Sequence, residues 1–227
     1  MSHVDYETCA HYVSRIIDQW NPSAEKLMDI ACGTGNFLNQ SRRYSNNISG
    51  FDFCHNSILQ ARKKSLDILL WVGDIRNFAI KNPVDVVVCL YDSINYVMSL
   101  NEISEILRCT YNALNNNGLF IFDICTENNS IKYFHDFFDQ NSGPDYSYTR
   151  HSLYDKTNKI HSNLFKINFH NADVIFVEEH RQRIYYIKDL LDIINISPFD
   201  FISAFDDFSF KKASEKSIRV HFVLKKE

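Results

Sequence analysis

The stretch Leu27-Met28-Asp29-Ile30-Ala31-Cys32-Gly33-Thr34-Gly35-Asn36-Phe37-Leu38 decides the fold. It begins as an apolar run, passes through a turn with two glycines, and continues with the spacing of an amphipathic helix. In a parallel sheet, such a strand–turn–helix unit presents a small ligand at the carboxyl end of its strand. Gly33 and Gly35 would let backbone N–H groups approach that ligand, because no Cβ stands in the way.

The residues around this turn restrict the ligand. A dinucleotide-binding turn would carry a third glycine where Leu38 stands, and a P-loop would carry Gly-Lys-Ser/Thr, which is absent. Asp29 instead places a carboxylate before the turn, which suits a cationic group such as the ammonium of an amino acid. A turn whose glycines serve geometry alone is the alternative interpretation.

Strand and helix patterns alternate through the first half of the chain. The pattern predicts strands at 26–32, 68–72, 84–90 and 119–125, a turn followed by a strand within 46–53, and helices at 5–20, 35–44, 56–66 and 99–115. The cluster Asn115-Asn116-Asn117-Gly118 is expected to end the last of these helices. This alternation predicts a doubly wound, Rossmann-like α/β sheet with its ligand at the carboxyl ends of the strands.

Acidic and polar residues follow several of these strands. Asp52 comes 17 residues after Gly35, where an acid can accept hydrogen bonds from two ribose hydroxyls. Asp74 can accept from the exocyclic amine of a base, although a turn cap is the alternative role for it. The predicted cofactor-binding residues are Asp29, Ala31, Gly33, Gly35, Asn36, Phe37, Asp52, Phe53, Asp74, Ile75, Leu90, Tyr91, Asp92 and Asn95.

The periodicity changes to two between about residues 146 and 186, which predicts antiparallel strands. Turns are expected at Asp155-Lys156-Thr157-Asn158 and at His170-Asn171-Ala172-Asp173. A helix over 188–195 and a hairpin of 199–205 with 218–224 would complete the first sheet. We expect a mixed seven-stranded sheet from residues 1–125 and 187–227, with an antiparallel β lid inserted as 126–186. A decorative or dimer-forming role is the alternative for that insertion.

Composition argues against several classes of protein. The chain has 24 Lys+Arg against 28 Asp+Glu, so no strong basic field attracts nucleic acid. No apolar run approaches the ~20 residues needed to cross a bilayer, and the amino terminus is not a signal peptide. The six cysteines are expected to be reduced in a cytoplasmic protein. The nine histidines show no metal-ligand spacing, so no metal is expected.

Several separated stretches together resemble the class I S-adenosylmethionine-dependent methyltransferases. Asp29 to Gly35 is similar to their first motif, Gly50-Phe51-Asp52 to their ribose-binding step, and Gly73-Asp74-Ile75 to their adenine step. Leu90 to Tyr96 looks like the exit of strand four in small bacterial and archaeal members. Glu179-His180-Arg181-Gln182-Arg183 resembles a strand of their inserted sheet. Asn117-Gly118 departs from the family's Gly-Gly pair, and the extended amino-terminal arm of many members is missing.

The resemblance implies an S-adenosyl-L-methionine-dependent methyltransferase (EC 2.1.1.-) acting on a small-molecule acceptor, with a nitrogen atom preferred over oxygen. We expect no nucleic-acid or membrane partner, and a monomer or homodimer. The alternatives are a methyltransferase of a protein or RNA group and a non-catalytic cofactor-binding module.

Methyl transfer from a sulfonium releases a neutral thioether, so a base is needed only when the acceptor arrives protonated. The candidates for that base are His180, which we prefer, and Tyr12, His151 and Glu178. The candidate acceptor contacts are Tyr148, Arg150, Arg183 and Tyr186. The alternative is that His180 and Arg183 only hold the lid, through Glu178 or Glu179.

Overall fold

The computed structural model describes residues 5–45, 47–64, 67–171 and 174–227. Its helices are α1 (Tyr6–Trp20), α2 (Asn36–Ser41), α3 (His55–Lys64), the 3₁₀ helix η1 (Ser93–Tyr96), α4 (Leu100–Ala113), α5 (Glu127–Tyr133) and α6 (Ile187–Ile196). Its strands are β1 (Lys26–Ile30), β2 (Asn47–Asp52), β3 (Leu69–Val72), β4 (Val84–Cys89), β5 (Leu114–Cys125), β6 (Phe137–Ser142), β7 (Tyr146–Asp155), β8 (Ile160–Phe169), β9 (Ile175–Arg183), β10 (Asp200–Asp206) and β11 (Arg219–Lys225).

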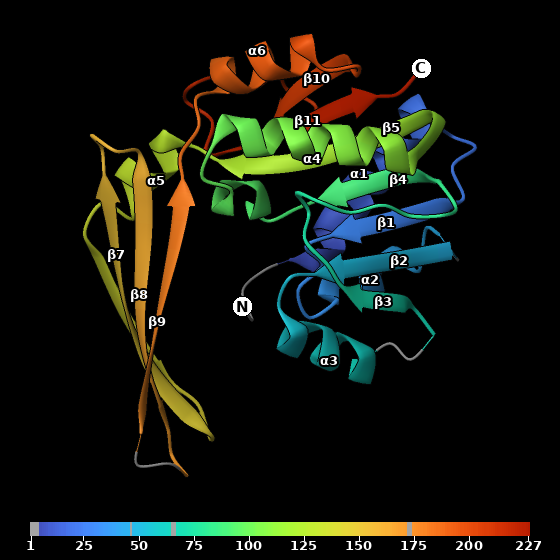
Figure 1. Ribbon diagram of the computed structural model, residues 1–227. Helices are drawn as coiled ribbons and strands as arrows, with labels where there is room; N and C mark the ends of the chain where they lie inside the picture. Colours follow the sequence, from blue (N-terminus) through green and yellow to red (C-terminus); the bar gives the residue numbers. More distant parts are fainter. Residues whose placement is uncertain (1–4, 46, 65–66, 172–173) are drawn as a thin grey trace.

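Seven of the described strands form one sheet, in the order β10-β11-β5-β4-β1-β2-β3. The five strands from β5 to β3 are parallel neighbours, whereas β11 pairs antiparallel with both β5 and β10. The predicted Rossmann-like mixed sheet is therefore confirmed. In Figure 1 the arrows of β1, β2 and β4 point toward the separate upright sheet that contains β7, β8 and β9.

Helices cover both faces of the large sheet. Helices α1, α2 and α3 contribute to one apolar cluster, and α4 and α6 to another on the opposite face. Strand β5 shows why the central strands are apolar throughout: Phe120 and Phe122 belong to one cluster, and Leu119 and Ile121 belong to the other. Because both faces are covered, small ligands have access chiefly at the ends of the strands.

The Asn115–Gly118 cluster does not end α4 as predicted. The helix stops at Ala113, and the cluster lies within β5 where the pairing with β4 is irregular. Asn117 has φ +64°, which asparagine tolerates better than most residues, so it can stand in for glycine there. A Cβ on Gly118 would lie 2.7 Å from the carbonyl oxygen of Asn115, so that residue is glycine for lack of space.

The smaller sheet has four described strands, in the order β6-β7-β8-β9, and follows β5 in the sequence. The sequence analysis missed α5 and β6, because their polar residues show no clear period. The predicted turn at Asp155 forms, with its carboxylate accepting hydrogen bonds from the backbone of Thr157 and Asn158. The other predicted turn includes 172–173, and the predicted helix 56–66 includes 65–66; these residues lie outside the described ones. Within the described part of the chain, no helix has the length and apolar character to span a bilayer.

Candidate active site

A cleft of about 610 Å³ lies between the carboxyl ends of β1, β2 and β4 and the inserted sheet. Its size is typical of small-molecule sites. The large sheet and its loops contribute Asp29, Ala31, Cys32, Gly33, Thr34, Asn36, Phe37, Asp52, Ser57, Leu90, Tyr91, Asp92, Ser93, Tyr96 and Arg219. Helix α1 contributes Tyr6, and the inserted sheet contributes Arg150, Asn163, Phe165, His180 and Gln182.

The two glycines of the first turn have different functions. Both have positive φ, +53° at Gly33 and +75° at Gly35. A Cβ on Gly33 would meet nothing within 4 Å, so its open side is available to a ligand in the cleft. A Cβ on Gly35 would lie 3.1 Å from the Cβ of Ala61 on α3, so this glycine permits close helix packing. Gly35 does not line the cleft.

Asp29 is a buried carboxylate in the wall of the cleft. Its exposed fraction is 3%. Burial raises its pKa well above the ordinary value, and the nearby carboxylates of Asp52 and Asp123 raise the pKa further. A cation bound in the cleft would relieve this unfavourable environment and stabilise the ionised form.

Asp52 ties the end of β2 to the glycine turn. Its Oδ2 accepts a hydrogen bond from the Gly33 N–H at 2.8 Å, and its Oδ1 accepts one from the Cys54 N–H at 2.8 Å. An ionised carboxylate has about four acceptor sites, so both oxygens retain capacity for ligand hydroxyls. The position fits the ribose-binding function that we predicted for this residue.

The loop after β4 is held in a strained conformation over the cleft. Tyr91 and Asp92 have φ of +58° and +55°, which is uncommon for residues other than glycine. The carboxylate of Asp123 accepts hydrogen bonds from the N–H groups of both, at 3.1 and 2.5 Å. Asp123 is itself buried and paired with Arg219 Nη1 at 2.8 Å. These contacts stabilise a backbone conformation of the kind often found at functional sites.

The same loop joins the inserted sheet to the large sheet. Gln182 on β9 donates a hydrogen bond to Asp92 Oδ2 at 2.9 Å. Asn95 donates to the carbonyls of Cys125 and Arg183, at 3.2 and 2.8 Å, and accepts from the Cys125 N–H at 2.9 Å. The Asn95 side chain, which we predicted to contact the cofactor, is fully buried and bonded to backbone from both sheets. Asn95 does not line the cleft, and its hydrogen bonds connect the large sheet to the inserted sheet.

Strand register places His180 in the cleft. Residue 163 on β8 pairs with His180, and residue 165 pairs with Arg150, so all four side chains share one face of the inserted sheet. The Nδ1 of His180 lies 3.3 Å from the hydroxyl of Tyr96, and its Nε2 lies 3.4 Å from Glu178. The ring of Phe165 packs edge-on against it, with centroids 5.4 Å apart.

Three other candidate bases lie outside the cleft lining. Tyr12 is a buried residue of α1, and its hydroxyl donates to the carbonyl of Ser209 at 3.1 Å. His151 follows Arg150 on β7 and therefore points to the opposite face of the sheet, where its Nε2 lies 2.7 Å from Asp136. Glu178 shares the face of His180, but most of its side chain is exposed to solvent.

The predicted adenine contacts also lie outside the lining. Asp74 follows β3, yet its carboxylate is bound by the guanidinium of Arg76, at 2.7 Å from Nη2, which lowers its pKa. Ile75 follows it and is not in the lining either. Phe53 is 75% exposed. Phe53 was predicted as a further cofactor contact, and like Asp74 and Ile75 it does not border the cleft.

The predicted acceptor contacts divide between three hollows. Arg150 lines the cleft, whereas Tyr148 lies further along β7 and borders a separate groove at the outer end of the inserted sheet. Arg183 and Tyr186 border a third hollow beside the start of α4. The structure therefore does not bring these four residues together in one site.

Several lining residues were missed by the sequence analysis as ligand contacts. Gln182 could have been found, because it lies two residues after His180 on a strand with period two. Phe165 and Asn163 belong to the neighbouring strand, whose register cannot be read from the sequence. Arg219 begins β11 opposite Cys125, and no local pattern marks it.

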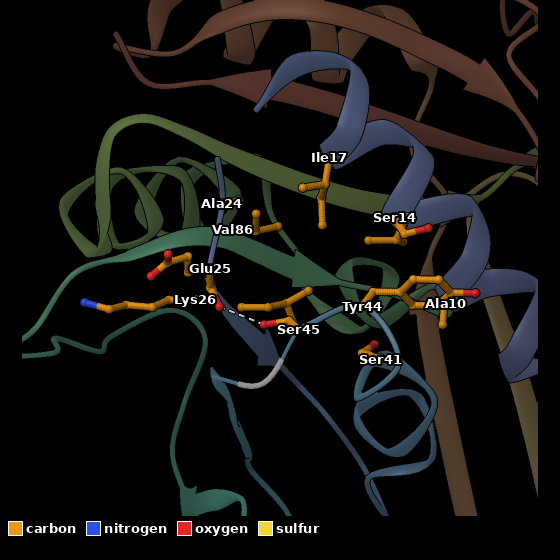
Figure 2. A pocket seen from close by; sticks show the side chains of 12 residues that line it. Ala10, Ser14, Ile17, Ala24, Glu25, Lys26, Ser41, Tyr44, Ser45 and Val86 are labelled. Atoms are coloured by element: carbon orange, nitrogen blue, oxygen red, sulfur yellow. Dashed lines mark hydrogen bonds between the residues drawn. The ribbon is translucent and has the colours of Figure 1, made fainter. Parts of the chain in front are cut away.

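A smaller apolar hollow of about 30 Å³ lies near the opposite ends of the strands. Figure 2 shows its lining, which comes from α1, the start of β1 and the segment after α2. The side chain of Ser45 donates to the carbonyl of Glu25 there, at 2.7 Å. The hollow has room for about one water molecule, so it does not compete with the cleft as a ligand site.

Comparisons with known proteins identify similar sequences and structures. Residues 27–118 match a family model described as a methyltransferase domain. A putative methyltransferase of Bacillus subtilis strain 168, YqeM, is 25% identical over 232 residues, covering 100% of this chain and 92% of the relative.

A solved structure and an enzyme of known substrate are also similar. A crystal structure of a S-adenosylmethionine-dependent methyltransferase from Clostridium acetobutylicum ATCC 824 superposes with a TM-score of 0.86 at 21% identity, covering 99% of this chain and 93% of that one. The dTDP-3-amino-3,4,6-trideoxy-alpha-D-glucopyranose N,N-dimethyltransferase of Streptomyces venezuelae is 25% identical over 119 residues, covering 52% of this chain and 50% of the enzyme. The chain is therefore a class I S-adenosylmethionine-dependent methyltransferase, distantly related to sugar N,N-dimethyltransferases.

Proposed function

We propose that this methyltransferase transfers its methyl group to the nitrogen of a small amine, with His180 as the proton acceptor. The observation that carries the proposal is that His180 of the inserted sheet lines the cleft and contacts the hydroxyl of Tyr96, which lies after β4 of the large sheet. The amino-sugar substrate in the name of the Streptomyces venezuelae relative makes amino sugars the first acceptors to test.

The residues of the large sheet fit S-adenosyl-L-methionine. The buried carboxylate of Asp29 would hold its ammonium group, the open side of Gly33 would let its backbone approach, and Asp52 would accept from the ribose hydroxyls. When bound, the donor supplies an electrophilic methyl group on a sulfonium. Under the proposal, residues 1–125 and 187–227 bind the donor, and residues 126–186 bind the acceptor.

The inserted sheet would bring the acceptor nitrogen to the donor. A protonated amine has no lone pair, so its proton must leave before nitrogen can attack the methyl carbon. A neutral imidazole suits this step near neutral pH. Tyr96 and Glu178 contact the two ring nitrogens of His180 and would orient the ring. The remaining contribution is positioning of the two reactants within the cleft.

Two acceptors that differ at one functional group test the proposal. Glucosamine and glucose are each incubated with the donor, and the products are analysed by mass spectrometry. Methylation of the amine but not of the parent sugar supports transfer to nitrogen, and methylation of a hydroxyl would refute it. If neither is methylated, the test is repeated with dTDP-linked amino sugars; failure with all amines would refute the proposal.

His180→Gln and His151→Gln form a matched pair for the proton acceptor, because the two histidines lie on opposite faces of the inserted sheet. Removal of a general base costs roughly 10²–10⁴-fold in rate. We expect such a loss in kcat for His180→Gln, with unchanged binding of S-adenosylhomocysteine, and wild-type kcat for His151→Gln. Equal rates in the two variants would exclude His180 as the base.

A further inference from the structure

Arg150 lies on the acceptor side of the cleft and is only partly neutralised. Its Nη2 donates to Asp139 Oδ2 at 2.7 Å, and its side chain is 25% exposed. In the part of the chain that the structure describes, no hydrogen bond comes from its Nη1. One edge of the guanidinium is therefore free to bind a ligand in the cleft.

Three phenylalanine rings surround this guanidinium. Its Cζ lies 5.6 Å from the ring centroid of Phe134, 5.5 Å from that of Phe137 and 6.0 Å from that of Phe165. The rings restrict the rotamers of Arg150 and shield part of its guanidinium from water. A charge that is held in place and shielded from water binds an opposite charge more strongly than a mobile surface arginine does.

The charges of the cleft differ between its two walls. The wall formed by the large sheet carries the carboxylates of Asp29 and Asp52, which suit a cationic donor. The wall formed by the inserted sheet carries Arg150. The other arginine of the cleft, Arg219, already pairs with both Asp92 and Asp123, so its charge is compensated within the protein. A simple ammonium acceptor would face both Arg150 and the donor cation, which is unfavourable.

We propose that Arg150 binds an anionic group of the acceptor, a carboxylate or a phosphate, so that the substrate is an anionic amine. The proposal rests on the proposed function, because it assigns the amine to His180. The ring of Phe165 contacts both residues: it lies 5.4 Å from the His180 ring and 6.0 Å from Arg150 Cζ. Arg150 and His180 therefore border the same part of the cleft, where one acceptor molecule would reach both. A planar guanidinium can hold either anion through paired hydrogen bonds.

Binding of matched probes tests the proposal without any methyl transfer. Isothermal titration calorimetry on the full chain, saturated with S-adenosylhomocysteine, compares glucosamine 1-phosphate with glucosamine, and glycine with glycinamide. The first pair reports on phosphate and the second on carboxylate. We expect, in at least one pair, the probe that carries the anionic group to bind about 10- to 100-fold more tightly than its partner without that group, as for a charge-assisted pair.

The variants Arg150→Gln and Arg181→Gln separate this contact from general charge effects. Arg181 lies on the opposite face of the inserted sheet and is exposed. Arg150→Gln should abolish the preference for the anion, Arg150→Lys should keep part of it, and Arg181→Gln should keep all of it. The proposal is wrong if wild type shows no preference in either pair, or if Arg150→Gln leaves the preference intact.

Failure of the anion site at Arg150 can be distinguished from failure of the proposed transfer to nitrogen. Methyl transfer to the bound probes is measured separately by mass spectrometry, which shows the atom that is modified. An Arg150-dependent preference with methylation on oxygen would retain the anion site and refute the amine. Methylation of nitrogen without an anion preference would do the reverse.

Discussion

Gln182 of the inserted sheet donates a hydrogen bond to the carboxylate of Asp92, in the strained loop after β4, at 2.9 Å. The other oxygen of that carboxylate is bound by Arg219. Because Asp92 also lines the cleft, one carboxylate connects the large sheet, the inserted sheet and the ligand site. Its contacts set how the two walls of the cleft are held relative to each other.

Replacement of Gln182 by leucine should therefore remove this hydrogen bond between the inserted sheet and the loop after β4. We expect the free energy of unfolding to fall by about 1.5–3 kcal/mol, the usual contribution of a hydrogen bond to a charged group. Urea denaturation measures this loss. Relative to wild type, hydrogen exchange should accelerate more at the β9 amides near residue 182 than at those of β1. The control is Gln140→Leu, an exposed glutamine on β6 that should change neither measurement. Equal stability of the two variants would show that the contact with Asp92 contributes little.

Gly33→Ala and Gly35→Ala should have different effects, although both residues have positive φ. Alanine in this region costs about 1 kcal/mol or more in backbone strain. At Gly35 the new Cβ would also press against Ala61 at 3.1 Å, so we expect the larger fall in melting temperature there. At Gly33 the new methyl group has space but occupies the cleft side. We therefore expect Gly33→Ala to lose more affinity for S-adenosylhomocysteine than Gly35→Ala does, and to lose less melting temperature. The opposite ranking would contradict the functions assigned to the two glycines.

Asp52→Ala should weaken binding of the donor. Loss of charge-assisted hydrogen bonds to two ribose hydroxyls predicts a cost of about 1.5–3 kcal/mol, measured by calorimetry with S-adenosylhomocysteine. Asp52→Asn is the companion variant, because it removes the charge but can still accept a hydrogen bond from the Gly33 turn. Asp67→Ala is the control, since Asp67 is an exposed partner of Arg42. An unchanged affinity in both Asp52 variants would refute the ribose assignment.

Binding of the donor should become tighter as pH rises, because of Asp29. Burial and two neighbouring carboxylates raise its pKa well above 3.8 in the ligand-free protein, whereas a bound ammonium favours the ionised form. Binding therefore releases a proton at pH values between the pKa of Asp29 in the complex and its raised pKa in the ligand-free protein, and affinity increases through that window. Calorimetry in two buffers of different ionisation enthalpy counts the proton. Asp29→Asn should abolish the release; persistence of the full release in that variant would place the proton elsewhere.

The same shift predicts the stability of the ligand-free protein. An acid whose pKa is raised by folding makes the native state bind more protons than the unfolded state, so stability falls as pH rises above 3.8 through the raised pKa. Asp29→Asn removes a buried charge that has no ligand to compensate it. We expect this variant to melt at a higher temperature than wild type above that window, without donor present, while it binds the donor less well. A lower melting temperature would contradict the account of Asp29.

The sequence by itself determined the architecture of the large sheet and the meeting of Asp29 and Asp52 at one edge of it. Period and turn residues are local properties, so the apolar run to Ile30, the glycine turn and the later change to period two could each be recognised within a few residues. Parallel strands place their carboxyl ends together, and this rule alone brought Asp29 and Asp52 to one edge.

Only the tertiary structure decided which residues of the inserted sheet line the cleft and which contacts hold that sheet to the large sheet. Gln182 and Asp92 are 90 residues apart in the chain, and Arg219 and Asp92 are 127 apart. No local pattern encodes such pairs, because they depend on strand register and on how the inserted sheet docks. Each strand of the inserted sheet can turn either of its two faces toward the cleft, and its period of two does not say which. Pairing with the neighbouring strands decides that His180 on β9 faces the cleft and that His151 on β7 faces away from it.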